Sequence, residues 1–384
     1  MKKILSLIII HILNCLPIKK NKVFMFSYYG SQYGCNPKYL TKYMLDHKPD
    51  QFDIVWAFND PRARQVDDRV RKVKIMSLRY FYELCTSKVI ITNFRSTDLF
   101  VKRKKQTYIQ TWHSSLRLKQ IEKDAEHSLP AHYIDMAKKD SKKCDLLLSG
   151  SAYSTQIFRR SFWYEGEILE KGTPRNDFLC QSDVTNKIKN KLNIESNKKI
   201  VLYAPTFRKN NDMSVYDLDY AKLKESLTKR FGDEWIVLVK LHPHLISLSD
   251  RIQDKNIVDV TKYDDIQELL HISDVLITDY SSLMFDFSIT KRPCFLYVPD
   301  LDTYQNQDRK LYFDVNKLPF LPALTNEQLE EKIRSFSEGD YQRNLDLFLH
   351  HIGTFENGRA SEEVVNYITD ACFNKKRSEL DEAI

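Results

Sequence analysis

Short apolar runs recur along this chain, and most are followed by a polar loop and then by a helical segment. In the first half, such runs predict strands at residues 23–27, 52–58, 73–75, 88–92, 106–111, 144–148 and 168–170. In the second half, they predict strands at residues 199–203, 236–241, 257–260, 274–277 and 294–297. Helices are predicted at residues 38–45, 77–86, 131–141, 154–160, 187–192, 220–231, 266–272, 281–289, 325–335 and 361–371. Strands that alternate with helices are typical of parallel α/β sheets.

The alternation is interrupted once, by a lysine-rich stretch with Asn and Ser turn residues at 183–199. We therefore place a domain boundary near residues 181–195 and predict two α/β domains of similar size. The expected parts are an apolar segment (1–22), two Rossmann-like domains (23–185 and 186–373, the second with the C-terminal helices) and a polar tail (374–384). The predicted fold class is α/β, with two parallel sheets facing a central cleft.

One predicted strand end carries hydroxyl groups. The apolar run at 275–277 ends in Thr278-Asp279-Tyr280, which Ser281 and Ser282 follow where a helix is expected to begin. In open α/β sheets, ligands bind beyond the C-terminal ends of the strands. A helix N-terminus at that place presents N–H groups and a partial positive charge to an anion. The segment therefore predicts a phosphate site, and the alternative is a plain helix cap.

Two other strand ends carry imidazoles. The run at 235–239 leads into Lys240, Leu241 and His242, and the strand at 106–111 leads into Trp112 and His113. These positions predict a phosphate-handling cleft, with His113 contributed by the first domain and His242 by the second. The alternative for each histidine is a structural role, in which the ring satisfies a backbone group. His244 is a second candidate for the role given to His242.

The composition excludes several other kinds of site. The 384 residues include only 9 glycines, and neither G-x-G-x-x-G nor G-x-x-x-x-G-K-[ST] occurs, so dinucleotide and P-loop fingerprints are absent. The 7 cysteines contain no C-x-x-C, so neither zinc nor a disulfide framework is indicated, and a reducing cytoplasm fits. The net charge of +7 is compatible with anionic substrates or an anionic membrane surface, and no nucleic-acid-binding signature accompanies it.

A tightly held metal is not expected either. Asp217 and Asp219 form a D-x-D in a polar loop, without an apolar strand before them. Asp264 and Asp265 are predicted to begin a solvated helix, with contacts to a nucleotide base as the alternative. We therefore predict catalysis without a bound metal ion.

The N-terminal segment allows two interpretations. Residues 4–16 are mostly apolar and are flanked by lysines, but about 13 residues are too few for a transmembrane helix, which needs roughly 20. No small-x-small cleavage site follows, as a signal peptide would require. The segment is either an interfacial helix at a membrane surface or the first packed helix of the domain, and we favour peripheral membrane contact.

Six ordered segments carry a resemblance to a known family. They are residues 27–30 with 36–39 (SYYG and NPKY), 110–113 (QTWH), 172–177 (GTPRND), 202–208 (LYAPTFR), 241–243 (LHP) and 276–287 (LITDYSSLMFDF). With these segments in this order, the chain resembles the CDP-glycerol glycerophosphotransferases of teichoic acid and capsule assembly from about residue 26 to residue 367.

The resemblance implies a two-domain GT-B fold. It also implies transfer of glycerol phosphate, or a related polyol phosphate, from a CDP-alditol to a hydroxyl of a lipid-linked acceptor. We therefore expect a CDP-activated polyol as donor, a prenyl-diphosphate-linked glycan as acceptor, and no tightly bound cofactor or nucleic acid. The expected location is the cytoplasmic face of the cell membrane, as a peripheral protein.

The resemblance also implies roles for individual residues. His113 resembles the catalytic base that takes the proton of the acceptor, and His242 the group that stabilises the transferring phosphate or the departing CDP. The predicted substrate-binding residues are Ser114, Ser115, Arg175, Pro205, Thr206, Lys240, Leu241, Ser281, Ser282 and Asp286. For Arg175 the alternative is a charged surface turn, and for Asp286 a carboxylate that faces solvent near a helix start.

One motif departs from the family pattern. The family usually has Gly-Thr-Pro after the first histidine, whereas this chain has Ser114-Ser115-Leu116. Serine restricts the backbone more than glycine but offers a hydroxyl donor. This altered segment motivates one rival function, a non-catalytic binding subunit. The other rival is a GT-B glycosyltransferase that uses a nucleotide sugar and has a similar cleft and phosphate site.

Overall fold

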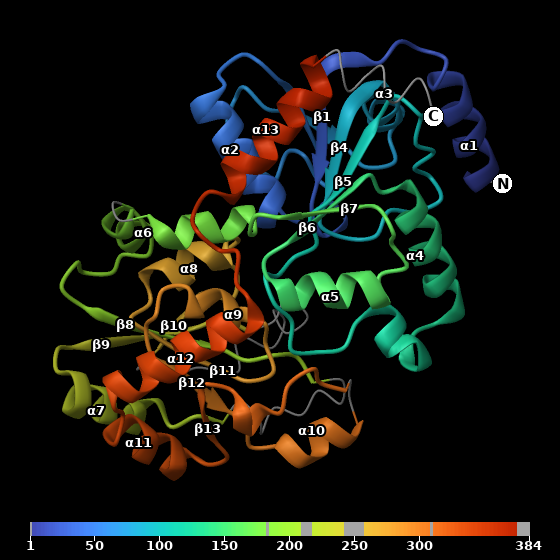
Figure 1. Cartoon of the computed structure of the whole chain (residues 1–384). Helices are drawn as coiled ribbons and strands as arrows, with labels where there is room; N and C mark the ends of the chain where they lie inside the picture. Colours follow the sequence, from blue (N-terminus) through green and yellow to red (C-terminus); the bar gives the residue numbers. More distant parts are fainter. Residues whose placement is uncertain (1, 182–183, 209–216, 242–256, 308–309, 375–384) are drawn as a thin grey trace. The chain divides into compact units, whose positions relative to one another are not determined.

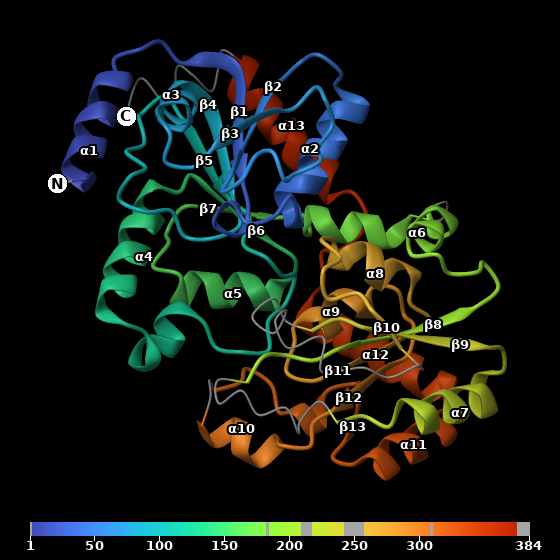
Figure 2. The ribbon, with the colours of Figure 1, turned by 180° about the vertical axis from the view of Figure 1, so that it is seen from behind.

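The computed structural model describes residues 2–181, 184–208, 217–241, 257–307 and 310–374, and Figures 1 and 2 show it from opposite sides. The chain divides into two α/β units. The first unit consists of Met1–Ser115, Ile121–Asp177 and Phe355–Ile384, and the second of Leu116–Gln120 and Phe178–Thr354.

The first unit is built on a seven-stranded sheet in the order β3-β2-β1-β4-β5-β6-β7, and every pair of neighbours is parallel. Its strands are β1 (Lys19–Phe26), β2 (Asp53–Phe58), β3 (Arg71–Lys74), β4 (Ser87–Thr92), β5 (Thr107–Gln110), β6 (Leu146–Ser149) and β7 (Glu167–Glu170). The strand order reverses between β1 and β4, which is where open α/β sheets bind ligands.

Helices cover both faces of this sheet, so the central strands are apolar on both sides. They are α1 (Lys2–Leu13), α2 (Cys35–His47), α3 (Leu78–Thr86), α4 (Ala131–Lys143), α5 (Ala152–Ser161) and α13 (Ala360–Phe373). Figure 1 shows α2 and α13 side by side on one face and α3 with α1 on the other. Leu40 and Ile368 pack on the first face, and Phe81 and Ile10 on the second.

The second unit has a six-stranded sheet in the order β10-β9-β8-β11-β12-β13, and its neighbours are also parallel. Its strands are β8 (Lys199–Ala204), β9 (Trp235–Val239), β10 (Ile257–Asp259), β11 (Val275–Thr278), β12 (Cys294–Tyr297) and β13 (Leu321–Ala323). Its helices are α6 (Thr185–Lys191), α7 (Tyr220–Phe231), α8 (Ile266–Ile272), α9 (Leu283–Ser288), α10 (Leu301–Gln307), α11 (Asn326–Arg334) and α12 (Glu338–Ile352). In Figure 1, α8 and α9 lie on one side of this sheet and α7 with α11 on the other. The strand order reverses between β8 and β11.

Several helices begin where a side-chain oxygen caps the first turn. Ser77 Oγ accepts the N–H of Tyr80 at the start of α3, and Asp219 Oδ1 accepts the N–H of Lys222 at the start of α7. Asp265 caps α8 in the same way, so the predicted helix start is confirmed, although this residue is buried rather than solvated.

Two segments pack with a different unit from the one expected. The last helix, α13, contacts α2, β1 and β4, so it belongs to the first unit instead of to a domain of residues 186–373. The short segment Leu116–Gln120 belongs to the second unit, where Lys119 forms an antiparallel bridge with Leu311. These packing choices depend on contacts between residues far apart in sequence, which the local apolar pattern does not contain.

The N-terminal segment forms α1, and its two sides differ. Ile10 is 1% exposed and packs in the apolar cluster beside α3, whereas Ile4 and Ile12 are each 65% exposed. One side of α1 is therefore packed on the first unit, as the second interpretation predicted, and contact of its exposed side with a membrane stays a prediction. Among the described residues, no helix is long and apolar enough to cross a membrane.

Candidate active site

In the first unit, three loops at adjacent strand ends form the candidate site. They follow β1, β4 and β5, which are neighbours at the point where the strand order reverses. The loop after β5 carries His113, and the loop after β4 begins with Asn93. The sequence therefore placed His113 correctly at a strand end of a parallel sheet.

The ring of His113 has a defined orientation. Its Nδ1 lies 3.2 Å from the backbone oxygen of Asn93. A carbonyl oxygen can only accept, so Nδ1 carries the proton in this contact and Nε2 carries the lone pair of the neutral ring. The imidazole also stacks on Trp112, with 4.5 Å between ring centroids and 28° between ring planes. This tautomer is the one that a proton-accepting Nε2 requires.

Trp112 holds an unusual backbone conformation, with φ of +49°. A bulky residue in the left-handed region costs roughly 1–3 kcal/mol and persists only where the surroundings enforce it. Here the Trp112 N–H donates to Gln110 Oε1 at 3.0 Å, and its carbonyl accepts from Asn36 Nδ2 at 3.2 Å. The peptide groups on either side of Trp112 are thus fixed, and so is the position of His113 next to it.

Asn36 connects the His113 loop to the Arg175 turn, a role that the sequence did not reveal. It is fully buried, its Nδ2 also donates to the Thr111 carbonyl at 3.2 Å, and its Oδ1 accepts the N–H of Arg175 at 3.0 Å. All three contacts are long-range, so the only available signal was the presence of Asn36 in the NPKY segment.

Arg175 is 4% exposed, which excludes the alternative of a charged surface turn. Its Nη1 lies 3.8 Å from Cys35 Sγ. Much of the surrounding GTPRND segment has a structural role. Asp177 accepts the N–H groups of Ala360 and Ser361 at the start of α13, at 3.0 and 2.6 Å, and burial raises the pKa of its carboxyl.

Ser114 and Ser115, which replace the family's Gly-Thr, are both buried. The Ser115 carbonyl accepts from Ser154 Oγ at 2.6 Å. A Cβ added at Gly150 would lie 2.3 Å from Ser115 Oγ, so only glycine allows these two loops to approach so closely. The two serines are therefore part of a tightly packed loop, and their binding role stays a prediction.

In the second unit, the loops after β8 and β11 lie on either side of the second switch point and carry Pro205, Thr206, Ser281 and Ser282. Pro205 is buried. The N–H of Thr206 lies 2.9 Å from Asp279 Oδ1, and its hydroxyl lies 3.1 Å from Oδ2. Arg208 pairs with Asp279 at 2.9 Å and with Asp300 at 2.7 Å. Asp279 thus joins the loops after β8 and β11, and Arg208 links them to Asp300 in the loop after β12. The sequence assigns neither carboxylate a role, because their partners lie far away along the chain.

The loop after β11 leads into the six-residue helix α9. Ser281 Oγ accepts the N–H of Leu283 at 3.3 Å, whereas Ser282 makes no side-chain cap bond. Asp286 is fully buried, which excludes the alternative of a solvent-facing carboxylate. The binding roles of Ser281, Ser282 and Asp286 stay predictions.

Lys240 lies at the end of β9 and points its ammonium group at backbone carbonyls. Its Nζ donates to Tyr263 at 2.6 Å and to Thr261 at 3.2 Å. Burial lowers the pKa of Lys240 to about 8, although Asp264 and Asp265 act against this. The Leu241 N–H donates to Thr261 Oγ1, so both residues hold the loop after β10. Whether they also bind the donor is a prediction.

His242 and its alternative, His244, lie outside the described residues. The prediction that His113 and His242 act on the same phosphate therefore stays a prediction. In the described part of the chain, no group of three or more His, Cys, Asp or Glu is arranged to hold a metal ion.

Comparison with known proteins identifies the family. The model of the CDP-glycerol:poly(glycerophosphate) glycerophosphotransferase family matches residues 8–370. The chain belongs to this family. The predicted family, transferase class and fold class of two parallel α/β units are thereby confirmed.

Relatives of this glycerophosphotransferase include enzymes of teichoic acid synthesis. It is 34% identical to the teichoic acid poly(glycerol phosphate) polymerase of Bacillus spizizenii, over 93% of this chain and 94% of that protein. It is 33% identical to the teichoic acid glycerol-phosphate transferase of Staphylococcus aureus, over 93% of this chain and 95% of that protein. The match to the Bacillus subtilis polymerase, at 34% identity, spans only 50% of that longer protein.

The structural neighbours agree. A variant of the wall teichoic acid polymerase TagF soaked with CDPG superposes with a TM-score of 0.83 at 30% identity, over 96% of this chain and 93% of that chain. A UDP-N-acetylglucosamine 2-epimerase from Listeria monocytogenes shares the fold alone, with a TM-score of 0.54 at 12% identity over 92% of this chain and 96% of that chain.

Proposed function

We propose that this glycerophosphotransferase moves glycerol phosphate from CDP-glycerol to a hydroxyl of a lipid-linked acceptor in teichoic acid synthesis. The observation that carries the proposal is the bond between His113 Nδ1 and the Asn93 carbonyl, because it makes Nε2 the proton acceptor in a member of this family. Glycerol is favoured as the polyol. Identity reaches 34% with a poly(glycerol phosphate) polymerase and 28% with a poly(ribitol-phosphate) polymerase.

In the proposed reaction, His113 Nε2 accepts the proton of the acceptor hydroxyl as its oxygen attacks the phosphorus that bears glycerol. The bond from this phosphorus to the bridging oxygen breaks. CDP-glycerol carries two phosphates and one is transferred, so the departing nucleotide is CMP, not the CDP named above. General-base catalysis of this kind contributes about 10²–10⁴-fold to the rate.

Charge on the transferring phosphate needs stabilisation, which is the main task of a protein in phosphoryl transfer. Thr206, Ser281 and Ser282 lie at the loops after β8 and β11, where a phosphate is expected at a switch point. We assign Arg175 and His242 to the same task from the family motifs alone. No step in this proposal uses a metal ion.

The test is a panel of donors. Purified protein is incubated with radiolabelled CDP-glycerol, CDP-ribitol and nucleotide sugars in the presence of a prenyl-diphosphate-linked glycan, and products are identified by mass spectrometry. We expect the acceptor mass to rise by one or more glycerol phosphate units with CDP-glycerol. A product formed only from a nucleotide sugar would support the rival glycosyltransferase, and no product from any donor would support a binding subunit.

We further propose that α1 holds the protein at the cytoplasmic membrane surface, where a lipid-linked acceptor lies. Ile4, Leu5, Ile8 and Ile12 are more than half exposed and fall on one side of the helix. An exposed apolar stripe with flanking lysines is typical of an interfacial helix.

Replacing Ile4 and Ile12 with serine is expected to weaken binding to anionic vesicles. Burying one isoleucine contributes roughly 1.5–3 kcal/mol, so losing two corresponds to at least about a hundredfold in affinity. The measurement is cosedimentation with phosphatidylglycerol vesicles. A matched control replaces Leu324 and Leu347, which are 44% and 65% exposed on the second unit. Equal vesicle binding by the Ile4/Ile12 variant and the wild type would disprove this role of α1.

A further inference from the structure

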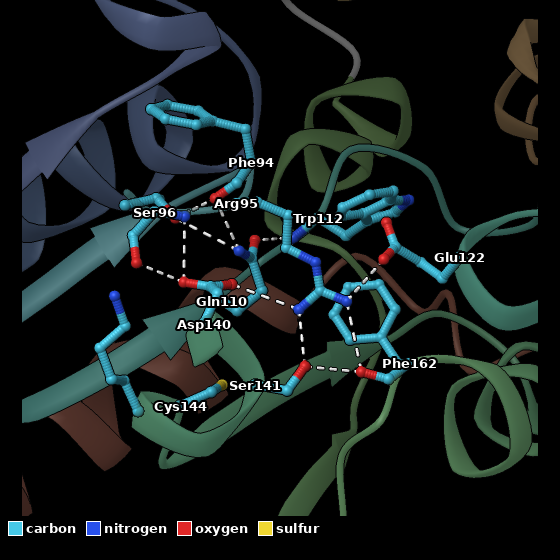
Figure 3. A network of polar contacts seen from close by, with 12 residues as sticks. Phe94, Arg95, Ser96, Gln110, Trp112, Glu122, Asp140, Ser141, Cys144 and Phe162 are labelled. Carbon is cyan, nitrogen blue, oxygen red and sulfur yellow. Dashed lines mark hydrogen bonds and ion pairs between the residues drawn. The ribbon is translucent and has the colours of Figure 1, made fainter. Parts of the chain in front are cut away.

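A buried ion cluster lies next to the His113 loop and has no part in the function described so far (Figure 3). Arg95, only 1% exposed, pairs through Nη2 with Glu122 at 3.0 Å and through Nη1 with Asp140 at 3.2 Å. Nη1 also donates to Ser141 Oγ at 2.8 Å. A buried ion pair is weak evidence for stability, because desolvation offsets its attraction. The geometry that the cluster fixes is the more informative property.

The guanidinium supports a series of ring contacts that ends at His113. Its Cζ lies 3.6 Å from the centroid of the Phe162 ring and 6.0 Å from that of Trp112. Trp112 meets Phe162 edge to face, with centroids 5.0 Å apart at 88°, and its other neighbour is the imidazole of His113. Figure 3 shows the guanidinium between the carboxylates of Glu122 and Asp140, beside the ring of Phe162.

The same cluster also reaches the backbone of Trp112. Gln110 Nε2 donates to the carbonyl of Phe94 at 2.7 Å, directly before Arg95, while Gln110 Oε1 accepts the N–H of Trp112. Asp140 Oδ1 accepts from the N–H of Ser96 at 3.0 Å, directly after Arg95. The residues on both sides of Arg95 are therefore fixed, and the left-handed turn at Trp112 is fixed relative to them.

We propose that Arg95 is a positioning residue for His113: held by Glu122 and Asp140, it supports the Phe162–Trp112 pair that orients the imidazole toward its proton-transfer geometry. This inference rests on the proposed function, in which His113 is the base. The planar fork of arginine binds two carboxylates and stacks on a ring at once, which lysine cannot do. A displacement of about 1 Å in a catalytic group can cost about 10²-fold in rate.

The first test compares Arg95→Lys with Arg71→Lys. Arg71 is a matched control because it also pairs with two carboxylates of the first unit, those of Asp53 and Glu83, but at the opposite, N-terminal edge of the sheet. We expect Arg95→Lys to lower kcat by about 10–100-fold with KM for CDP-glycerol nearly unchanged. Arg71→Lys is expected to leave both constants near their wild-type values. Equal kcat in the two variants would overturn the proposal.

The second test does not need turnover. Protein labelled with ¹⁵N-histidine reports the tautomer of each imidazole, and the His113 signals are assigned by their loss in His113→Asn. We expect the Nδ1–H tautomer in the wild type and in Arg71→Lys, and a mixture of tautomers in Arg95→Lys. A pure Nδ1–H tautomer in folded Arg95→Lys would overturn the positioning role. If the wild type transfers nothing from CDP-glycerol, the proposed function fails, while this spectrum still decides the role of Arg95.

If circular dichroism finds that Arg95→Lys is unfolded, Trp112→Phe takes its place in both tests. Trp112→Phe keeps an aromatic ring but removes most of the surface on which His113 stacks. The same fall in kcat and the same mixture of tautomers are expected. Wild-type values for both in Trp112→Phe would overturn the proposal.

Discussion

Replacing His113 with asparagine is expected to lower kcat for glycerol-phosphate transfer by about 10²–10⁴-fold and to leave the fold intact. An asparagine amide can still donate to the Asn93 carbonyl, which Nδ1 of the imidazole contacts at 3.2 Å. It cannot accept the acceptor's proton near pH 7. The loss should therefore fall on the chemical step, and the affinity for CDP-glycerol should change little.

The measurement is the rate of CMP release under saturating donor and acceptor, together with thermal unfolding of both proteins. His132→Asn is a matched control, because His132 is exposed on α4 and does not belong to the three loops of the candidate site. Undiminished transfer by a folded His113→Asn protein would remove His113 from the reaction. The same loss in His132→Asn would point to an indirect effect of changing a histidine.

Replacing Arg208 with methionine is expected to destabilise the second unit by about 3–5 kcal/mol, because it leaves the buried carboxylate of Asp279 without its cation. Arg208 is 4% exposed and Asp279 is 2% exposed. Burial by itself would lower the pKa of Arg208, but Asp279 and Asp300 raise it above its ordinary value, so the guanidinium stays charged. Its removal also loosens the contact between Asp279 and Thr206, which joins the loops after β8 and β11.

The free energy of unfolding is measured in urea for Arg208→Met and for Arg230→Met. Arg230 donates to the Phe336 carbonyl through Nε at 2.9 Å and pairs with no carboxylate of the described residues, so its loss breaks hydrogen bonds but leaves none of these carboxylates unpaired. Its expected cost is about 1–2 kcal/mol. Adding Asp279→Asn to Arg208→Met should recover part of the stability, since a neutral amide is cheaper to bury than a carboxylate. The proposed cause, an unpaired carboxylate, would be wrong in either of two cases. One is that Asp279→Asn recovers no stability, and the other is that both arginine substitutions lower the free energy of unfolding equally.

Local pattern determined most of the secondary structure. Apolar runs predicted the central strands because parallel strands are buried on both faces. The bounds of β4 and β11 each agree with the predicted strands to within one residue. The helix predicted at residues 220–231 has the observed bounds of α7, Tyr220–Phe231, and the structure shows that Asp219 caps it. The sequence also placed His113 and Ser281 correctly after strand ends, where open α/β sheets bind ligands, and their roles in the reaction stay predictions.

The sequence by itself thus determined the family and the division into two α/β units, while the roles of the strand-end residues stay predictions. Only the tertiary structure decided that α13 packs on the first unit, that Leu116–Gln120 joins the second, and that Arg95 is buried with two carboxylates. The physical reason is the separation in sequence of the residues that make contact. A strand or a helix is specified by neighbours a few residues away, whereas Arg95 meets Glu122 and Asp140 across 27 and 45 positions. Such pairs exist only once the chain has folded, and no local period records them.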